Sequence, residues 1–220
     1  MSIQQEKFKA IADKIRKNTN ATEAIKPSAF ADKVDEVYKA GKQAEYDAFW
    51  DTFQQNGKRT SYYLAFPYWE DACYNPKYPV VTAPDGIPTN MMFDSAKITD
   101  TRVDIFVNCE RVDSMFRVCR NLKTVKRLVL TERTTTFNNF ATSCVALENF
   151  NVEGVINGNI DFHWSEKLTH ESLMKIINCL ADKTADTSGA EMVCTLGTTN
   201  LEKLSATEIA VATEKGWTLA

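Results

Sequence analysis

The stretch from Phe116 to Val152 constrains the fold more than any other, because one spacing of apolar residues occurs in it twice. The two copies, about 22 residues apart, are Val125, Leu128, Leu130 and Leu147, Phe150, Val152. That period lies in the range of repeat architectures, in which each unit buries apolar side chains against its neighbours. The alternation that ends each copy suits a short strand, with Leu128 and Leu130 directed inward. The spacing predicts a solenoid, and the alternative is a β-rich domain in which the spacing is a coincidence.

A run of Phe followed by Cys leads into each copy. The runs are Phe116-Arg-Val-Cys119-Arg-Asn-Leu122 and, with one extra residue, Phe140-Ala-Thr-Ser-Cys144-Val-Ala-Leu147, and a third lies upstream as Phe106-Val-Asn-Cys109-Glu-Arg-Val112. Free cysteine behaves as a small buried hydrophobe, so we expect these side chains to fill the turn before each strand. The runs resemble the irregular leucine-rich repeats of BspA-type bacterial surface proteins, over about residues 90–165. The resemblance implies a fold type and no particular function.

Composition and charge exclude several classes of function. A net charge of −3 leaves no electrostatic footprint for nucleic acid, and no apolar run approaches the roughly 18 residues of a membrane span. The N-terminal residues contain no apolar core of a signal peptide, so we expect none. The six cysteines form no C-x-x-C pair and there are only two histidines. We therefore predict reduced core thiols, no metal site and no cofactor.

Residues 1–56 form a predicted helical segment for anchoring or oligomerisation. An amphipathic helix over residues 4–18 is followed by a second from about Ser28 to Gln55. The apolar stripe of the second helix includes Phe30, Val34, Val37, Phe49, Trp50 and Phe53. Such a stripe packs either on the first coil of the solenoid or on copies of itself, and its spacing does not choose between them.

Residues 57–95 are rich in aromatic residues and proline. The aromatic residues that we consider for binding are Tyr62, Tyr63, Tyr68, Trp69, Tyr74 and Tyr78. One interpretation is an aromatic platform for sugars or a partner protein. The other, which we favour, is an irregular cap that shields the open end of the solenoid, because repeat arrays need capping ends.

Residues 96–220 are predicted to hold the repeats and a C-terminal cap. Residues 160–164 and 192–196 read as strands, as do residues 217–219. Thr169 is a predicted N-cap, and Ser205 with Glu208 forms a predicted capping box. The result is a β-α-β-α-β closure. We thus predict an α+β fold, a short irregular leucine-rich-repeat solenoid with N-terminal helices and this closure.

Segments near both ends carry a second resemblance. They are Ile11–Ile15, Ile25–Val34, Tyr38–Trp50, Leu168–Leu180, Leu196–Leu204 and Ala212–Leu219. Together they resemble leucine-rich-repeat proteins encoded among the tail genes of phages and prophages of gut bacteria. The resemblance implies a virion or tail-tip component that touches the host surface, made in the host cytoplasm. Its implied partners are other virion proteins, further copies of itself in a homo-oligomer, and a host-surface receptor or glycan, with neither nucleic acid nor membrane insertion.

No residue pattern points to catalysis, so we predict that the protein is not an enzyme. No G-x-S-x-G, P-loop or H-E-x-x-H motif occurs. His163 and His170 are expected at the surface. Glu70 and Asp71 could serve a glycan-degrading enzyme only as a carboxylate pair, yet neighbours on an extended strand point opposite ways. The main alternative to a virion protein is a bacterial cell-surface or secreted adhesin or binding module.

Overall fold

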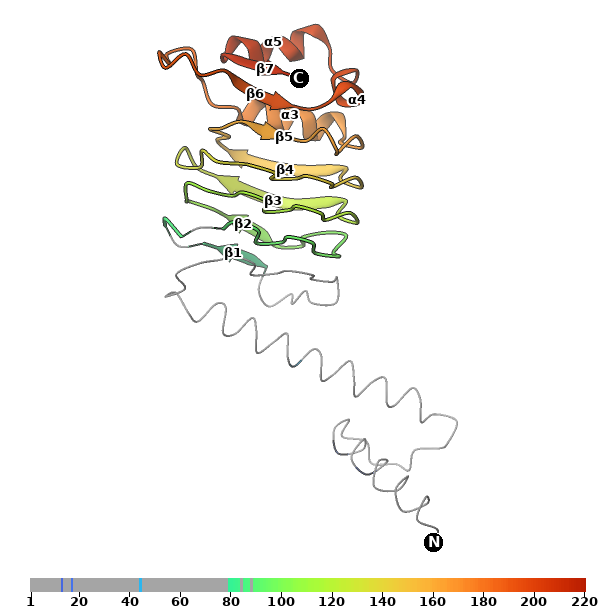
Figure 1. The fold of residues 1–220 in the computed structure, drawn as a ribbon. Helices are drawn as coiled ribbons and strands as arrows, with labels where there is room; N and C mark the ends of the chain where they lie inside the picture. The colour runs from blue at the N-terminus through green and yellow to red at the C-terminus, as the bar shows by residue number, and fades with distance from the viewer. Residues whose placement is uncertain (1–12, 14–16, 18–43, 45–78, 84, 88) are drawn as a thin grey trace. The chain divides into compact units, whose positions relative to one another are not determined.

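The computed structural model describes residues 13, 17, 44, 79–83, 85–87 and 89–220. The chain divides into two compact units, Met1–Gln55 and Asn56–Ala220. The described residues of the second unit form parallel sheets with few helices (Figure 1). Among them every strand pairing is parallel, so the class is α/β and not the predicted α+β.

The larger sheet takes one strand from each successive turn of the chain. Its strands are β1 (Val80–Thr82), β2 (Asp104–Phe106), β3 (Thr124–Leu130) and β4 (Asn149–Gly154), in that order. We call each strand, with the turn segment that leads to the next one, a rung. Val125, Leu128 and Leu130 of β3 are buried as predicted. Leu128 and Leu130 share a face because alternate side chains of a strand point to the same side, and Val125 joins them across a bulge.

A β-bulge sets the spacing between rungs. Val125 pairs with Phe150 and Leu128 with Val152, so β3 carries one residue more than β4 between these pairs. The predicted alignment of Val125 with Leu147 is therefore wrong by one motif position, and paired residues of adjacent strands are 23–25 positions apart in the sequence. The extra residue leaves both Lys126 and Arg127 between buried neighbours, as expected where a bulge opposes two residues to one.

The predicted Phe and Cys runs form columns through the core. Phe93 stacks on Phe116 with ring centroids 5.4 Å apart, and Phe116 meets Phe140 edge-on at 5.5 Å. The burial of the runs from Phe116 and from Phe140 is thus confirmed. The third predicted run, from Phe106, is out of register, since Phe106 lies half-exposed on β2 opposite Val129. The upstream member of the column is Phe93.

The turn segments share one backbone conformation although their residues differ. Left-handed residues recur at two equivalent positions of consecutive rungs, with φ between 53° and 65°. They are Met91, Ser114 and Asn139 at the first position and Ser95, Val118 and Ser143 at the second. Glycine occupies none of these six positions, which explains why no glycine period marks the repeats in the sequence.

A helix replaces the strand of the next rung. Glu148 N–H donates to Lys123 O, and Thr169 N–H donates to Glu148 O in the same way. Thr169 then caps α3 (His170–Cys179), as predicted, by accepting from Ser172 N–H. The Ser172 hydroxyl accepts from Phe150 N–H at 2.9 Å and donates to Glu148 O at 3.1 Å. The helix thereby covers the edge of β4, and the Ser172 hydroxyl makes hydrogen bonds that the backbone of a neighbouring strand would otherwise make.

A second parallel sheet continues the stack, in the order β5-β6-β7 (Figure 1). Its strands are β5 (Ile160–Asp161), β6 (Met192–Thr195) and β7 (Trp217–Leu219), and α4 (Thr198–Leu201) and α5 (Ala206–Glu214) join the last two. The predicted capping box of Ser205 and Glu208 is confirmed. The predictions missed α4, and β5 ends at Asp161, earlier than expected. No helix of the described part could span a membrane.

Candidate binding surfaces

The residues singled out for binding and anchoring lie outside the described part of the chain. They are Tyr62, Tyr63, Tyr68, Trp69, Tyr74 and Tyr78 of the aromatic segment and Phe30, Val34, Val37, Phe49, Trp50 and Phe53 of the N-terminal stripe. The carboxylate pair Glu70 and Asp71 also lies outside it. Candidate sites in the described part come from three other regions.

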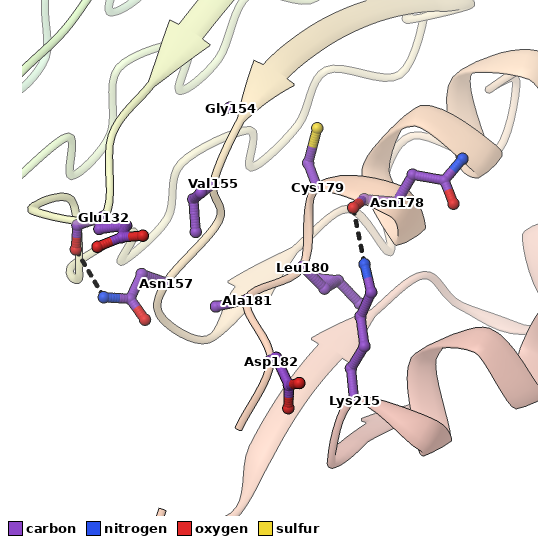
Figure 2. A pocket seen from close by; sticks show the side chains of 10 residues that line it. All are labelled: Glu132, Gly154, Val155, Asn157, Asn178, Cys179, Leu180, Ala181, Asp182 and Lys215. Carbon is purple, nitrogen blue, oxygen red and sulfur yellow. Dashed lines mark hydrogen bonds between the residues drawn. The ribbon is translucent and has the colours of Figure 1, made fainter. Parts of the chain in front are cut away.

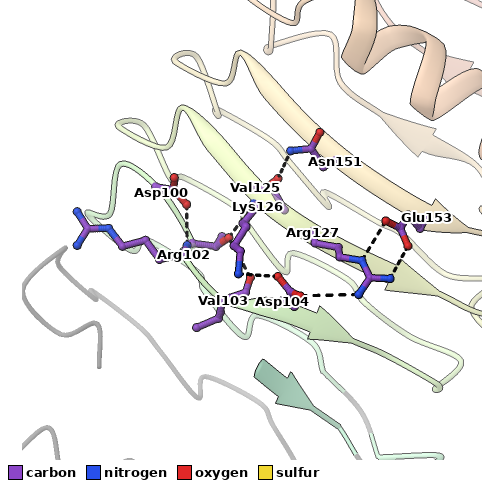
Figure 3. Close-up of polar contacts among 10 residues, drawn as sticks. Asp100, Arg102, Val103, Asp104, Val125, Lys126, Arg127, Asn151 and Glu153 are labelled. Carbon is purple, nitrogen blue, oxygen red and sulfur yellow. Dashed lines mark hydrogen bonds and ion pairs between the residues drawn. The ribbon is translucent and has the colours of Figure 1, made fainter. Parts of the chain in front are cut away.

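The first region is the outward face of β2, β3 and β4, where charged side chains of adjacent strands meet (Figure 3). Arg127 donates two hydrogen bonds to Glu153, at 2.9 and 2.7 Å. On its other side Asp104 lies 3.7 Å from Arg127 and 2.9 Å from Lys126. The contact with Lys126 lacks hydrogen-bond geometry, so it is an ion pair only. The bulge thus brings two cations from one strand to a single carboxylate.

The charges of this face neutralise one another. Hydrogen bonds from Arg127 lower the pKa of Glu153, and Glu153 in turn raises the pKa of Arg127. The Arg127 guanidinium also lies over the Phe106 ring, 5.1 Å from its centroid. Both charges of the pair remain largely exposed to solvent. The face therefore presents mixed polar groups and no one-signed field that would attract nucleic acid.

The polar row continues onto α3. Asn151 donates from its amide to Val125 O at 3.2 Å, and Lys175 donates to Asn151 Oδ1 at 2.7 Å. Lys175 also donates to Glu171 at 2.7 Å, which lowers the pKa of that carboxyl. Two adjacent cations inside an otherwise alternating strand were the sequence signal for the bulge and hence for this row.

The second region is an open pocket of about 550 Å³ (Figure 2). It is lined by Glu132, Gly154, Val155, Asn157, Asn178, Cys179, Leu180, Ala181, Asp182 and Lys215. Asn157 donates to Glu132 O at 2.6 Å, and Lys215 donates to Asn178 O at 2.7 Å. Lys215 thus stabilises the carbonyl end of α3. The amide and the ammonium hold the walls together. The Asp182 Oδ1 atom accepts from the N–H and the hydroxyl of Thr184. The Glu132 carboxylate and the other oxygen of Asp182 suit a ligand with hydrogen-bond donors.

The third region follows β5, where Asp161 and His163 resemble two members of a catalytic triad. The His163 Nδ1 atom lies 2.7 Å from Asp161 Oδ1. Ser165, two residues further on, is fully buried, and its hydroxyl takes no hydrogen bond in the described part. It is therefore not joined to the imidazole, as a nucleophile and its base would be. His163 and His170 are both surface side chains, as expected.

The cysteines of the described part are core residues. Cys109, Cys119, Cys144 and Cys194 are buried and free, and Cys179 is half-buried. Burial raises the pKa of Cys194 to about 12. The hydrogen bond with Cys144 and burial raise the pKa of Cys119 as well. High thiol pKa values disfavour the thiolate that nucleophilic catalysis needs. No group of ligand residues that could hold a metal ion occurs among the described residues.

Comparison with known proteins adds no relative. No family model matches the chain, and neither a curated protein nor a solved structure does.

Proposed function

We propose that the chain is a short irregular leucine-rich-repeat solenoid that serves as a structural protein of a phage tail or tail tip. It would act in virion assembly or in binding to the host surface, without catalysis. The virion part of this proposal rests on the resemblance of the segments between Ile11 and Leu219. The binding part rests on the arrangement of the described residues.

The observation that carries the binding part is the contrast between the two faces of the larger sheet. Inward positions repeat from rung to rung, as in Ile105, Leu128 and Val152. Outward positions change at every strand, as from Phe106 to Val129 to Glu153. In repeat proteins a constant core supports a variable surface, and such surfaces serve recognition.

The test is mass spectrometry of purified phage particles induced from the producing strain. Peptides of this chain at a fixed ratio to the other tail proteins are expected. A matched preparation of uninduced cells gives the background. Finding the protein on intact cells or free in the medium, and absent from particles, would overturn the virion assignment and favour an adhesin or secreted binding module.

A truncated chain tests the role of the N-terminal segment. Phage carrying a copy that lacks residues 1–55 is expected to form particles without this protein, while the remaining chain keeps its melting transition. Incorporation of the truncated protein at the wild-type ratio would show that the segment is not the anchor.

A further inference from the structure

Trp164 is a large apolar side chain that folding leaves in water. Half of it is exposed, and the only other exposed large hydrophobic residues of the described part are Val80 and Val145. Tryptophan is usually highly buried, because leaving its large apolar surface in water forgoes much stabilisation. The indole therefore stabilises the fold less than a buried tryptophan would, which suggests that its exposed face serves binding.

Polar groups in fixed positions stand beside this indole. The His163 ring lies 4.6 Å from the Trp164 ring, centroid to centroid, at an angle of 45°. Asp161 Oδ1 accepts from His163 N–H at 2.8 Å and lies 2.7 Å from His163 Nδ1. The imidazole is thus held by its Nδ1 atom. Within the described residues, His163 Nε2 and Asp161 Oδ2 take no hydrogen bond, so both stay available to a ligand.

The neighbouring rung leaves this place uncovered. Gly197 lies against the backbone of His163, where an added Cβ atom would stand 3.4 Å from His163 Cα. Gly197 has φ of +78°, a conformation that favours glycine. A Cβ atom at this position would be in ordinary van der Waals contact with His163, so the backbone conformation and not the available space is what favours glycine. Gly197 therefore adds no side chain beside His163.

We propose that Trp164, His163 and Asp161 form a binding subsite for a pyranose sugar. A pyranose has an apolar face of C–H groups, which matches the indole, and a rim of hydroxyls, which matches the two free acceptors. A protein partner fits less well, because interface tryptophans lie within packed apolar surroundings, and here the ring beside Trp164 is the polar imidazole of His163. The subsite names the class of ligand, a sugar, for the proposed binding to the host surface. It rests on that proposed function only in assigning the sugar to a glycan of the host.

The test uses the purified full chain on an array of immobilised bacterial oligosaccharides, followed by saturation-transfer NMR with the methyl pyranoside of the sugar that binds. Wild-type protein is expected to bind, with transfer to the C–H protons of one ring face. Trp164→Ala is expected to weaken binding by about tenfold or more. Val145→Ala is the matched control, since it removes an equally exposed apolar side chain, and its binding should equal that of the wild type.

Three results would overturn the subsite. They are no binding of the wild type to any saccharide, equal binding by Trp164→Ala, and a change of oligomeric state in Trp164→Ala on gel filtration, which would make the indole a contact between copies. The melting transition of each variant shows that it is folded. A protein that is present in virions but binds no sugar refutes the subsite alone. One that binds sugar but is absent from virions refutes the virion assignment alone.

Discussion

The central rungs and the C-terminal end satisfy their buried carbonyl groups in different ways. At the stacked phenylalanines of the central rungs a thiol does so, since Cys119 donates to Phe93 O and Cys144 to Phe116 O, both at 2.9 Å. At the C-terminal end the Asn200 amide donates to both Ser165 O and Leu196 O. A small, weak donor suffices where one rung stacks on the next in register. Where the stack ends, a side chain with two strong donors takes its place.

The same contrast holds for the edges of strands. Between β3 and β4 the backbone groups pair with each other, whereas β4 meets α3 through the Ser172 hydroxyl. The rungs therefore depend on close approach of backbone to backbone, and the C-terminal end depends on particular polar side chains. Four sets of substitutions test this division, and the largest effect is expected from backbone contact.

Gly154→Ala should cause the largest loss. An added Cβ atom would lie 1.9 Å from Leu130 O, and Gly154 has φ of +84°. We expect the free energy of unfolding to fall by about 3 kcal/mol or more, because two backbones must move apart. Urea denaturation followed by circular dichroism measures it.

Gly189→Ala is the control for Gly154→Ala. Gly189 has φ of +74°, but its added Cβ atom would meet nothing within 4 Å. Gly189→Ala should lower the free energy of unfolding by about 1 kcal/mol, which is the cost of the backbone conformation without a steric clash. Equal losses at the two glycines would show that close backbone approach is not what holds the rungs together.

Ser172→Ala and Ser165→Ala compare two buried serines at the C-terminal end. The Ser172 hydroxyl bonds to Phe150 N–H and Glu148 O. Its removal leaves the buried Phe150 N–H without this acceptor, while Glu148 O keeps its bond from Thr169 N–H, and should cost about 2 kcal/mol. The Ser165 hydroxyl has no partner in the described part, so its removal should be neutral or stabilising by up to about 1 kcal/mol. The midpoints of urea denaturation decide, and a loss at Ser165 equal to that at Ser172 would contradict the assignment.

These serines also show where sequence reasoning succeeds and fails. Local chemistry identified the N-cap Thr169 and the capping box at Ser205, because a cap depends only on neighbours within one helical turn. The predicted register was wrong, because one bulge residue at Lys126 and Arg127 shifts the pairing. The two adjacent cations between apolar residues are a local signal for a bulge, but they do not show which residues of the next strand pair with them. The role of Ser172 in covering β4 could not be predicted in this way, because its partner Phe150 lies 22 positions away in the sequence.

The binding surfaces were harder to predict than the core. Burial follows from the period of apolar residues, which is why Leu128 and Phe140 could be placed in advance. The meeting of Asp104, Arg127 and Glu153 depends on three separate rungs, so it required the register first. Trp164 lay in a predicted strand, and its exposure follows from the early end of β5.

Val118→Asn tests the shared turn conformation of the rungs and should increase stability. Val118 is left-handed with φ of 62°, a conformation that is strained for a β-branched residue and tolerated by asparagine. We expect a gain of about 1 kcal/mol in the free energy of unfolding. Ser143→Asn, at the equivalent position of the next rung, is the control and should change little. A loss of stability in Val118→Asn would indicate that packing of the valine outweighs its backbone strain.

Arg127→Ala should have the smallest effect, because the outward side chains of the rungs are solvated. Its ion pair with Glu153 is exposed, and exposed pairs contribute little and are screened by salt. The folded pKa of Glu153 is lowered by Arg127. Any stabilisation is therefore present above the unfolded pKa of that carboxyl and is lost as the pH falls through the folded one.

Thermal melts of Arg127→Ala and of Glu153→Gln at pH 7 should match the wild type closely, and the small difference should vanish in high salt and at acid pH. A loss as large as that of Gly154→Ala would mean that the outward row holds the rungs together. The division between a structural core and a surface that is free to vary for binding would then fail.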